Sequence, residues 1–405
     1  MLFSISWRNV WRSKLRSTVM LTAIALGITA GIFMTAFYKG MADQRIDKAI
    51  RTEISNIQIH DPGFRQNNDI NLYIPDALKI TQEINGESGV SGACSRIVIS
   101  SMVASAESFA GVKISGVFPD EEKKVTNLYK KVTDGNYFSK DRKNSVLISE
   151  KLADKLKVKL GSKVVLTLQD IHNNIISGAF RIVGLFNTHD NIFDESNLFV
   201  RYSDLARLMN MPDGAAHEIA IATTSNDAVN SVQKELSVKY PKLEVLSWYD
   251  LSPELGYLTD AMDLYMYIFI VIILLALLFG LVNTMLMVVL ERVKEIGMLM
   301  AVGMNRLRIF MMIVLETVFL SLSGGVIGII LGTLISNYFE SHKIPLSLWA
   351  SAYEDLGYDA FVYTSLDSKL VITITLLVLL TGLIGSLYPA YKALQNNPSE
   401  ALRID

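Results

Sequence analysis

Residues that could carry out catalysis or hold a metal are present, but not at the spacing such chemistry requires. The sequence has no H-E-x-x-H pair, no G-x-S-x-G nucleophile turn and no G-x-x-x-x-G-K-[ST] phosphate loop. Its single cysteine, Cys94, allows neither an intrachain disulfide nor a cysteine zinc site. His189 is followed closely by Asp190, Asp194 and Glu195, but such a cluster in a loop is more often solvated charge than a metal site. We therefore expect no catalytic residue, no metal site and no cofactor on this chain.

One carboxylate stands where charge is costly. Glu316 interrupts the otherwise uncharged run 309–339, and a charge inside a membrane-spanning helix costs about 2.5–3.5 kcal/mol on insertion scales. It lies ~12 Å beyond Arg308 by the helical rise. The favoured interpretation is a structural polar contact between helices, with Asn283 or a nearby arginine as the partner. The alternative is a polar hinge at the base of a moving helix.

Composition places the chain in a membrane. Of its 405 residues 50% are hydrophobic and only 19% are charged, whereas soluble domains average about 25% charged. The net charge of −2 gives no reason to expect binding to nucleic acid. Four apolar runs, 17–38, 264–290, 309–339 and 370–391, each reach the ~20 residues that a spanning helix needs.

The distribution of basic residues predicts the orientation of these helices. Arginine and lysine gather before the first run, between the second and third, and after the fourth, which favours a cytoplasmic position for both termini and that loop. The expected organisation is an amphipathic cytoplasmic helix at 1–16, transmembrane helices at 17–38, 264–290, 309–339 and 370–391, an outer domain at 39–263, a cytoplasmic loop at 291–308, a short outer loop at 340–369 and a cytoplasmic tail at 392–405.

The outer segment is predicted to be a mixed α/β domain, inserted between helices 1 and 2 of a one-plus-three arrangement. Alternating apolar residues predict strands, and helical patches lie between them. The predicted strands are 56–60, 96–100, 113–117, 146–148, 163–168, 179–185 and 198–200, and the predicted helices are 76–84, 149–156, 203–209 and 226–239. Apolar stripes also predict that helices 1 and 2 continue outward as stalks. A charged stretch at 119–136 suggests a subdivision of the domain.

Small residues mark faces where the membrane helices can approach closely. Gly324, Gly328 and Gly332 give overlapping G-x-x-x-G spacings in helix 3, and Gly27 with Gly31 gives another in helix 1. Because four helices make a thin bundle, we expect the chain to pair with a second copy or a paralogue.

The loop between helices 2 and 3 mixes charged and apolar residues in a helix-like stretch. Such a segment suits docking into a groove of a cytoplasmic partner, or lying on lipid headgroups as an amphipathic helix. Its residues resemble the E-R-x-x-E-I-G-x-x-x-A-x-G signature of FtsX-like and MacB-like permeases of ABC systems. The match is carried by Glu291, Arg292, Glu295, Ile296, Gly297, Ala301 and Gly303.

Both ends of the chain agree with this resemblance. The N-terminal stretch that agrees is Ser6-Trp7-Arg8-Asn9 with Arg12, Lys14 and Arg16, and the C-terminal one is Tyr388-Pro389-Ala390 with Ala393, Pro398, Ala401 and Leu402. The resemblance implies a non-catalytic permease of a bacterial inner membrane, with a periplasmic outer domain. It also implies that the loop docks a separate ATPase subunit, which binds ATP and Mg, and that two permeases assemble with two ATPases.

Within this family the outer domain is similar to the lipoprotein-releasing (Lol-type) transmembrane subunits, through 183–188 and 195–200. That similarity implies ATP-driven release of an acylated lipoprotein toward a periplasmic chaperone. Flexible apolar side chains near the outer ends of helices 1 and 2 are the expected lining for acyl chains: Met34, Phe37, Met41, Met262, Tyr265 and Ile268.

One departure keeps two other functions open. Lol-type subunits that recruit the chaperone carry a protruding hairpin, whereas the matching turn here, 170–178, looks short. MacB-like export with a periplasmic adaptor is therefore the second interpretation. FtsX-like signalling to a periplasmic partner is the third, although FtsX-type outer domains are much smaller than the segment 39–263.

Overall fold

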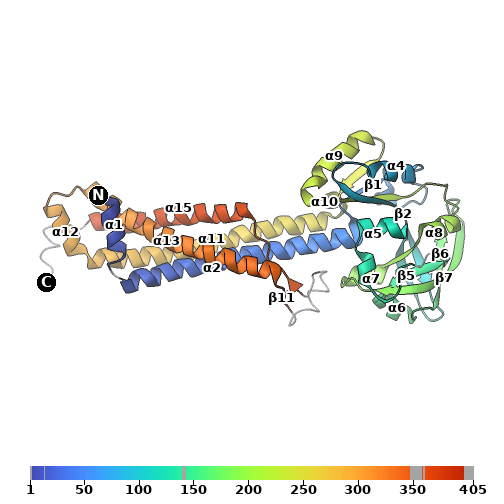
Figure 1. The fold of residues 1–405 in the computed structure, drawn as a ribbon, viewed down its shortest axis with the longest axis horizontal. Helices are drawn as coiled ribbons and strands as arrows, with labels where there is room; N and C mark the ends of the chain where they lie inside the picture. Colours follow the sequence, from blue (N-terminus) through green and yellow to red (C-terminus); the bar gives the residue numbers. More distant parts are fainter. Residues whose placement is uncertain (1, 13, 139–142, 347–357, 359–360, 396–405) are drawn as a thin grey trace. The chain divides into compact units, whose positions relative to one another are not determined.

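The computed structural model describes residues 2–12, 14–138, 143–346, 358 and 361–395 (Figure 1). They form two compact units. A helical unit comprises Met1–Asp43, Leu258–Pro345 and Phe361–Asp405, and an α/β unit comprises Gln44–Tyr257 and Leu346–Ala360.

Four helices in the described residues are long and apolar enough to cross a membrane. They are α2 (Lys14–Ala49), α11 (Pro253–Glu291), α13 (Arg306–Ser341) and α15 (Ser368–Leu394). The 36 residues of α2 span about 54 Å at 1.5 Å per residue, which exceeds a ~30 Å hydrocarbon core. A π-helical turn, Ile50–Ile54, then continues α2. Helix α2 therefore begins shortly before the predicted range 17–38 and continues well beyond its end, to Ala49.

Glycines let the long helices pack closely, as the placement of an added Cβ atom shows. On α13, a Cβ at Gly324 or Gly332 would lie 2.9 Å from Ile24 or Ile32 of α2, and one at Gly328 would lie 2.8 Å from the Ala25 carbonyl oxygen. Gly27 and Gly31 of α2 face Leu277 and Ile273 of α11 instead. All five predicted packing glycines thus contact helices of the same chain.

Two short helices complete the helical unit. Helix α1 (Leu2–Val10) packs on α13, and α12 (Val293–Ala301) lies between α11 and α13 along the chain. Strands β11 (Ile344–Pro345) and β12 (Phe361–Val362) pair between α13 and α15. The C-terminal signature residues Pro398, Ala401 and Leu402 lie outside the described residues, whereas Pro389 and Ala390 are buried in α15.

The α/β unit contains a ten-stranded sheet. Its strands are β1 (Ile57–His60), β2 (Val90–Ala104), β3 (Phe109–Val117), β4 (Val132–Gly135), β5 (Ser145–Ser149), β6 (Lys163–Gln169), β7 (Ile175–Phe186), β8 (Asn197–Arg201), β9 (Glu218–Thr223) and β10 (Glu244–Ser247). All seven predicted strands are present. Strands β4, β9 and β10 were not predicted.

The strand pairings close part of this sheet into a barrel. The ring runs β2-β3-β8-β5-β7-β6 and returns to β2, because β6 pairs with both β7 and β2. The first half of β2 leaves the ring to pair with β9, followed by β1 and β10. A boundary at 119–136 is therefore wrong, since β3 before it pairs directly with β8 after it.

Helices cover this sheet and close its core. They are α3 (Phe64–Asn67), α4 (Ala77–Ile84), α5 (Pro119–Val125), α6 (Glu150–Leu156), α7 (Asn191–Ser196), α8 (Tyr202–Met209), α9 (Val229–Lys239) and α10 (Trp248–Leu251), with short 3₁₀ turns at Leu128–Lys131 and Asn226–Ala228. The four predicted helical patches correspond to α4, α6, α8 and α9. The largest core cluster lies between these helices and the alternate, inward-facing residues of the barrel strands.

Candidate functional site

The signature loop folds into α12 with well-defined ends. Gly303 has φ +96°, its N–H donates to Met300 O at 3.0 Å, and Met304 N donates to Leu299 O at 2.9 Å. This pair of bonds is the Schellman motif, which favours glycine at the left-handed position. The Asn305 side chain then accepts from Leu307 N at 3.1 Å and caps α13. The glycine therefore sets the turn that separates α12 from α13.

Ion pairs connect this segment to the N-terminal part of the chain. Arg16 on α2 forms two bonds to Glu291, at 2.5 and 2.8 Å. Arg12 binds Glu295 of α12 through both carboxylate oxygens, at 3.0 and 2.7 Å. Arg292 adds a third contact, from its Nε to Glu295 at 3.0 Å. Two glutamates of the signature thus pair with two arginines of the N-terminal stretch that shares the family resemblance.

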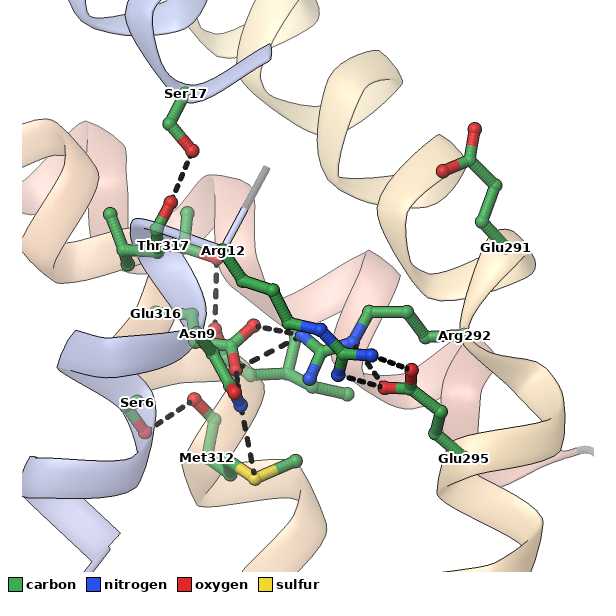
Figure 2. Close-up of polar contacts among 12 residues, drawn as sticks. Ser6, Asn9, Arg12, Ser17, Glu291, Arg292, Glu295, Met312, Glu316 and Thr317 are labelled. Atoms are coloured by element: carbon green, nitrogen blue, oxygen red, sulfur yellow. Dashed lines mark hydrogen bonds and ion pairs between the residues drawn. The ribbon is translucent and has the colours of Figure 1, made fainter. Parts of the chain in front are cut away.

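Glu316 lies at the centre of a buried polar cluster (Figure 2). Its side chain is 5% exposed, accepts from Asn9 Nδ2 at 2.6 Å and lies 3.3 Å from the Arg292 guanidinium. The predicted structural contact with a nearby arginine is therefore present. The partner is Arg292 rather than Asn283, whose side chain is exposed on α11. This carboxylate links α1, α13 and the start of the signature segment.

A cavity of about 340 Å³ opens beside these residues. Its charged lining is balanced, with Arg12, Arg16 and Arg292 against Glu291, Glu295 and Glu316, and its remaining wall is Asn9, Val10, Ser17, Met285, Val288 and Leu320. Burial opposes ionisation of Glu295, but hydrogen bonds from Arg292 and Arg12 outweigh it and lower the pKa of that carboxyl. Glu295 is therefore ionised at neutral pH in its pairs with these two arginines.

The signature residues divide into an inward and an outward set. Ile296 and Gly297 are buried, whereas Ala301 and Gly303 are exposed. The outward surface continues with Met298, 51% exposed, Val302, 89% exposed, and Leu307, 64% exposed. One face of α12 thus anchors the segment, and the other presents uncovered apolar side chains.

The predicted acyl-lining residues lie on α2 and α11. Met34, Tyr265 and Ile268 are 38%, 59% and 45% exposed, whereas Phe37, Met41 and Met262 are partly buried. The two helices contact each other here, because Tyr38 stacks on Phe269 at 5.6 Å between ring centroids. Several of the predicted side chains therefore face outward from the helical unit.

Acidic residues near His189 serve the local fold of the α/β unit. Asp190 caps α7 by accepting from Phe193 N at 3.1 Å, and Asp194 accepts from the Thr188 hydroxyl at 2.7 Å. In the described part of the chain, no three His, Cys, Asp or Glu side chains group as a metal site. The turn between β6 and β7 spans only 170–174, where Asp170 accepts from two backbone N–H groups.

Sequence reasoning missed a second buried charge cluster, in the α/β unit. Arg96 on β2 binds Glu122 of α5 and Glu218 of β9, both at 2.7 Å, and all three are almost fully buried. Burial opposes the charge on Glu218, but Arg96 outweighs it and lowers the pKa of this carboxyl. The cluster fixes α5 on the sheet, and no local sequence pattern indicates it. Asn9 was also missed, since a lone asparagine shows no partner 307 residues away.

Two family models cover most of the chain. The MacB-like periplasmic core domain matches residues 17–238, and the FtsX-like permease C-terminal domain matches 267–398.

Similar proteins agree with these models. An uncharacterized ABC transporter permease of Methanocaldococcus jannaschii is 26% identical over 232 residues, covering 55% of each chain. The lipoprotein-releasing system transmembrane protein LolC of Xylella fastidiosa is 25% identical over 305 residues, covering 72% of each. The chain thus spans about half the length of the M. jannaschii permease that it matches. The crystal structure of the periplasmic region of MacB from Actinobacillus actinomycetemcomitans matches with a TM-score of 0.36 and 14% identity, covering 54% of this chain and 98% of that one.

With the signature segment folded as α12 between two long apolar helices, and both family models in chain order, the chain belongs to the family of ABC transporter permeases of the FtsX, MacB and LolC type.

Proposed function

We propose that this chain is the non-catalytic permease subunit of a lipoprotein-releasing ABC system in a bacterial inner membrane. ATP and Mg bind to a separate cytoplasmic ATPase subunit, and the permease transmits the resulting motion to its periplasmic α/β unit. A second permease copy or a paralogue completes the assembly, with both termini and α12 on the cytoplasmic side.

The observation that carries this proposal is the two-faced geometry of α12. Its inner face is buried at Ile296 and Gly297, and Met298 is exposed on its outer face. The exposed apolar surface continues at Val302, where α12 ends, and at Leu307 in the first turn of α13. Exposed apolar side chains on a short helix suit insertion into a groove of a partner protein. The buried pair of Arg292 with Glu316 attaches the start of that helix to α13, and more exposed pairs add contacts with Arg12 and Arg16.

Two observations support lipoprotein as the substrate. LolC of X. fastidiosa aligns over 72% of this chain, and apolar side chains of α2 and α11 face outward where an acyl chain can reach them. Met34 and Ile268 are flexible or branched apolar groups that suit contact with hydrocarbon.

MacB-like export with a periplasmic adaptor is the second candidate, and one observation favours it. The β6–β7 turn is held tightly over 170–174 by the Asp170 side chain, so this subunit lacks a long hairpin there with which to hold a chaperone. FtsX-like signalling is a weaker third candidate, because residues 17–238 match the MacB-like periplasmic core domain.

Mass spectrometry of the complex purified from its own membranes separates these functions. An ATPase together with triacylated lipoprotein peptides is the expected result. An ATPase with a periplasmic adaptor and no lipoprotein would favour export, and an ATPase with a coiled-coil hydrolase activator would favour signalling. Absence of any ATPase would overturn the proposal.

A further inference from the structure

One face of the N-terminal helix α1 is attached to α13 by two side-chain hydrogen bonds. Ser6 Oγ donates to the Met312 carbonyl at 3.2 Å, and Asn9 donates to Glu316 at 2.6 Å. Ser6 and Asn9 are three residues apart on α1, and Met312 and Glu316 are four apart on α13, so both pairs lie on facing surfaces. Trp7 also packs edge-on against Phe319 at 5.6 Å. Helix α1 thus packs on α13 between Met312 and Phe319.

The carboxylate that accepts a hydrogen bond from Asn9 also binds Arg292, the second residue of the signature. Arg292 precedes α12 directly, and its guanidinium contacts both oxygens of Glu316 at 3.3 Å. It reaches Glu295 on the first turn of α12 at the same time, at 3.0 Å. One buried side chain on α13 therefore joins α12 and α1, which are distant in sequence (Figure 2).

The buried contact differs in kind from the exposed pairs around it. Glu316 is 4% exposed, whereas the side chains of Arg12 and Glu291 are 65% and 46% exposed. Exposed ion pairs are weak and are screened by salt, whereas a buried carboxylate that loses its partner is strongly disfavoured. The exposed pairs can separate at little cost, but Glu316 must keep its partners.

The same face of α13 continues into the contact with α2. The buried positions after Glu316 include Leu320, Gly324, Gly328 and Gly332, and these glycines lie against α2. Helix α2 is continuous through Ala49 into the turn that leads to β1. The stretch of α13 that follows Glu316 is therefore closely packed on α2 within the helical unit.

We propose that Glu316 is a positioning residue that fixes α12, α13 and α1 as one rigid body, so that a displacement of α12 by the ATPase moves α13 and α1 with it. This inference rests on the proposed function for the source of the displacement, but the rigid attachment itself is a property of this chain.

Distances between α1 and α12 test this attachment. Spin labels on cysteines introduced at Ser4 of α1 and Lys294 of α12, both exposed and neither part of the apolar surface proposed to meet the ATPase, report that distance in the full-length chain. The native Cys94 does not interfere, because it is fully buried in the α/β unit. The complex is measured with its co-purified ATPase, without nucleotide and with ATP plus vanadate. We expect one narrow distance that is the same in both states.

Four variants make the test specific. Glu316→Gln keeps an acceptor for Asn9 but removes the charge that holds Arg292, and Arg292→Gln removes the other partner; both should lose the single narrow distance. The exchange Glu316→Arg with Arg292→Glu should restore it, which a general loss of packing would not allow. Arg12→Gln, on an exposed pair, is the matched control and should keep it.

The outcomes separate the two proposals. A distance in Glu316→Gln as narrow as in the wild type, in both nucleotide states, would overturn the positioning role, as would failure of the exchange to restore it. If no ATPase co-purifies with the wild type, the proposed function fails. The nucleotide-free distances then still decide whether Glu316 fixes α1 to α12.

Discussion

Arg292 contacts both carboxylate oxygens of Glu316 at 3.3 Å, which joins the residue after α11 to the interior of α13. A charge at this position in a spanning helix is costly unless protein groups surround it. The side chains are 22% and 5% exposed, so water supplies little of that compensation. The pair and Asn9 therefore explain how the helical unit accommodates a carboxylate in α13.

Replacing Glu316 by leucine should destabilise the helical unit. The variant leaves the Arg292 guanidinium without its buried partner, and breaking a buried pair on one side costs about 3–5 kcal/mol. Partial exposure of Arg292 reduces this value. Thermal unfolding of the full-length protein in detergent should show a lower midpoint than the wild type.

The matched control is the double variant Glu316→Leu with Arg292→Met. An apolar replacement of both partners is often neutral, so this variant should recover most of the loss in thermal midpoint. If Glu316→Leu alone unfolds at the wild-type temperature, the pair is not a structural contact of any consequence.

The sequence was most informative where periodicity is local. Runs such as 264–290 and 370–391 predict spanning helices because length and apolar composition are the only properties that this prediction requires. Strand β6 alternates buried and exposed residues from Lys163 to Gln169 and was predicted for that reason. By contrast, β9 is buried on both faces from Glu218 onward, so its residues show no alternation.

The contacts of the site could not be predicted because they are distant in sequence. Glu291 and Glu295 were identified from their resemblance to a family signature. Their pairing with Arg16 and Arg12 depends on how the N-terminal part of the chain packs against α11 and α12. Glu316 was singled out because a charged side chain in a membrane-spanning helix has a high free-energy cost. Its partner Asn9 carries no comparable signal.

Replacing Gly297 by aspartate should uncouple ATP hydrolysis from function without preventing membrane insertion. Gly297 lies on the buried face of α12 next to Ile296, and a new carboxylate without a partner is unfavourable there. Helix α12 should therefore lose the packing of its buried face against the helical unit, while the ATPase still hydrolyses ATP. The measurements are ATPase activity and lipoprotein release in reconstituted vesicles.

The conservative variant Gly297→Ala adds a methyl group without charge and serves as the control. It should retain more coupled release than Gly297→Asp. Loss of the folded protein from the membrane in Gly297→Asp would show instead that the segment is needed only for folding.

The α/β unit should lose stability as the pH falls below neutrality. His60 and His217 are almost fully buried, they stack on the two sides of Phe64, and burial lowers the pKa of both imidazoles. Below the ordinary histidine pKa of about 6.5, the unfolded chain binds more protons than the folded one. Stability is therefore full above that pH and decreases as the pH falls toward the lowered folded pKa values.

Hydrogen exchange of β1 and β9 between about pH 7.5 and pH 5.5, corrected for intrinsic exchange, measures this effect. His60→Gln should reduce the dependence of protection on pH. His172→Gln, at the exposed β6–β7 turn, should leave that dependence unchanged. Equal slopes in all three proteins would rule out the buried imidazoles as its source.

Substitution of Gly40 by alanine should destabilise the protein more than the same change elsewhere in the long helices. An added Cβ at Gly40 of α2 would lie 1.8 Å from the Tyr363 carbonyl oxygen, so the segment before α15 must shift. That segment is also held to α2 by Lys39, 3.2 Å from Asp367, and by Ser365 N, which donates to Ala36 O at 2.9 Å. Overpacking of this kind typically costs about 1–3 kcal/mol.

Gly280 of α11 provides the control, because a Cβ there meets no atom within 4 Å. In a helix interior, Gly→Ala by itself gains about 0.5–1 kcal/mol, so Gly280→Ala should unfold at or slightly above the wild-type temperature in detergent. Gly40→Ala should unfold below it. If Gly40→Ala has the same thermal midpoint as Gly280→Ala, the segment from Tyr363 to Asp367 can move away from α2 without loss of stability. Its contacts with α2 would then contribute little to the stability of the protein.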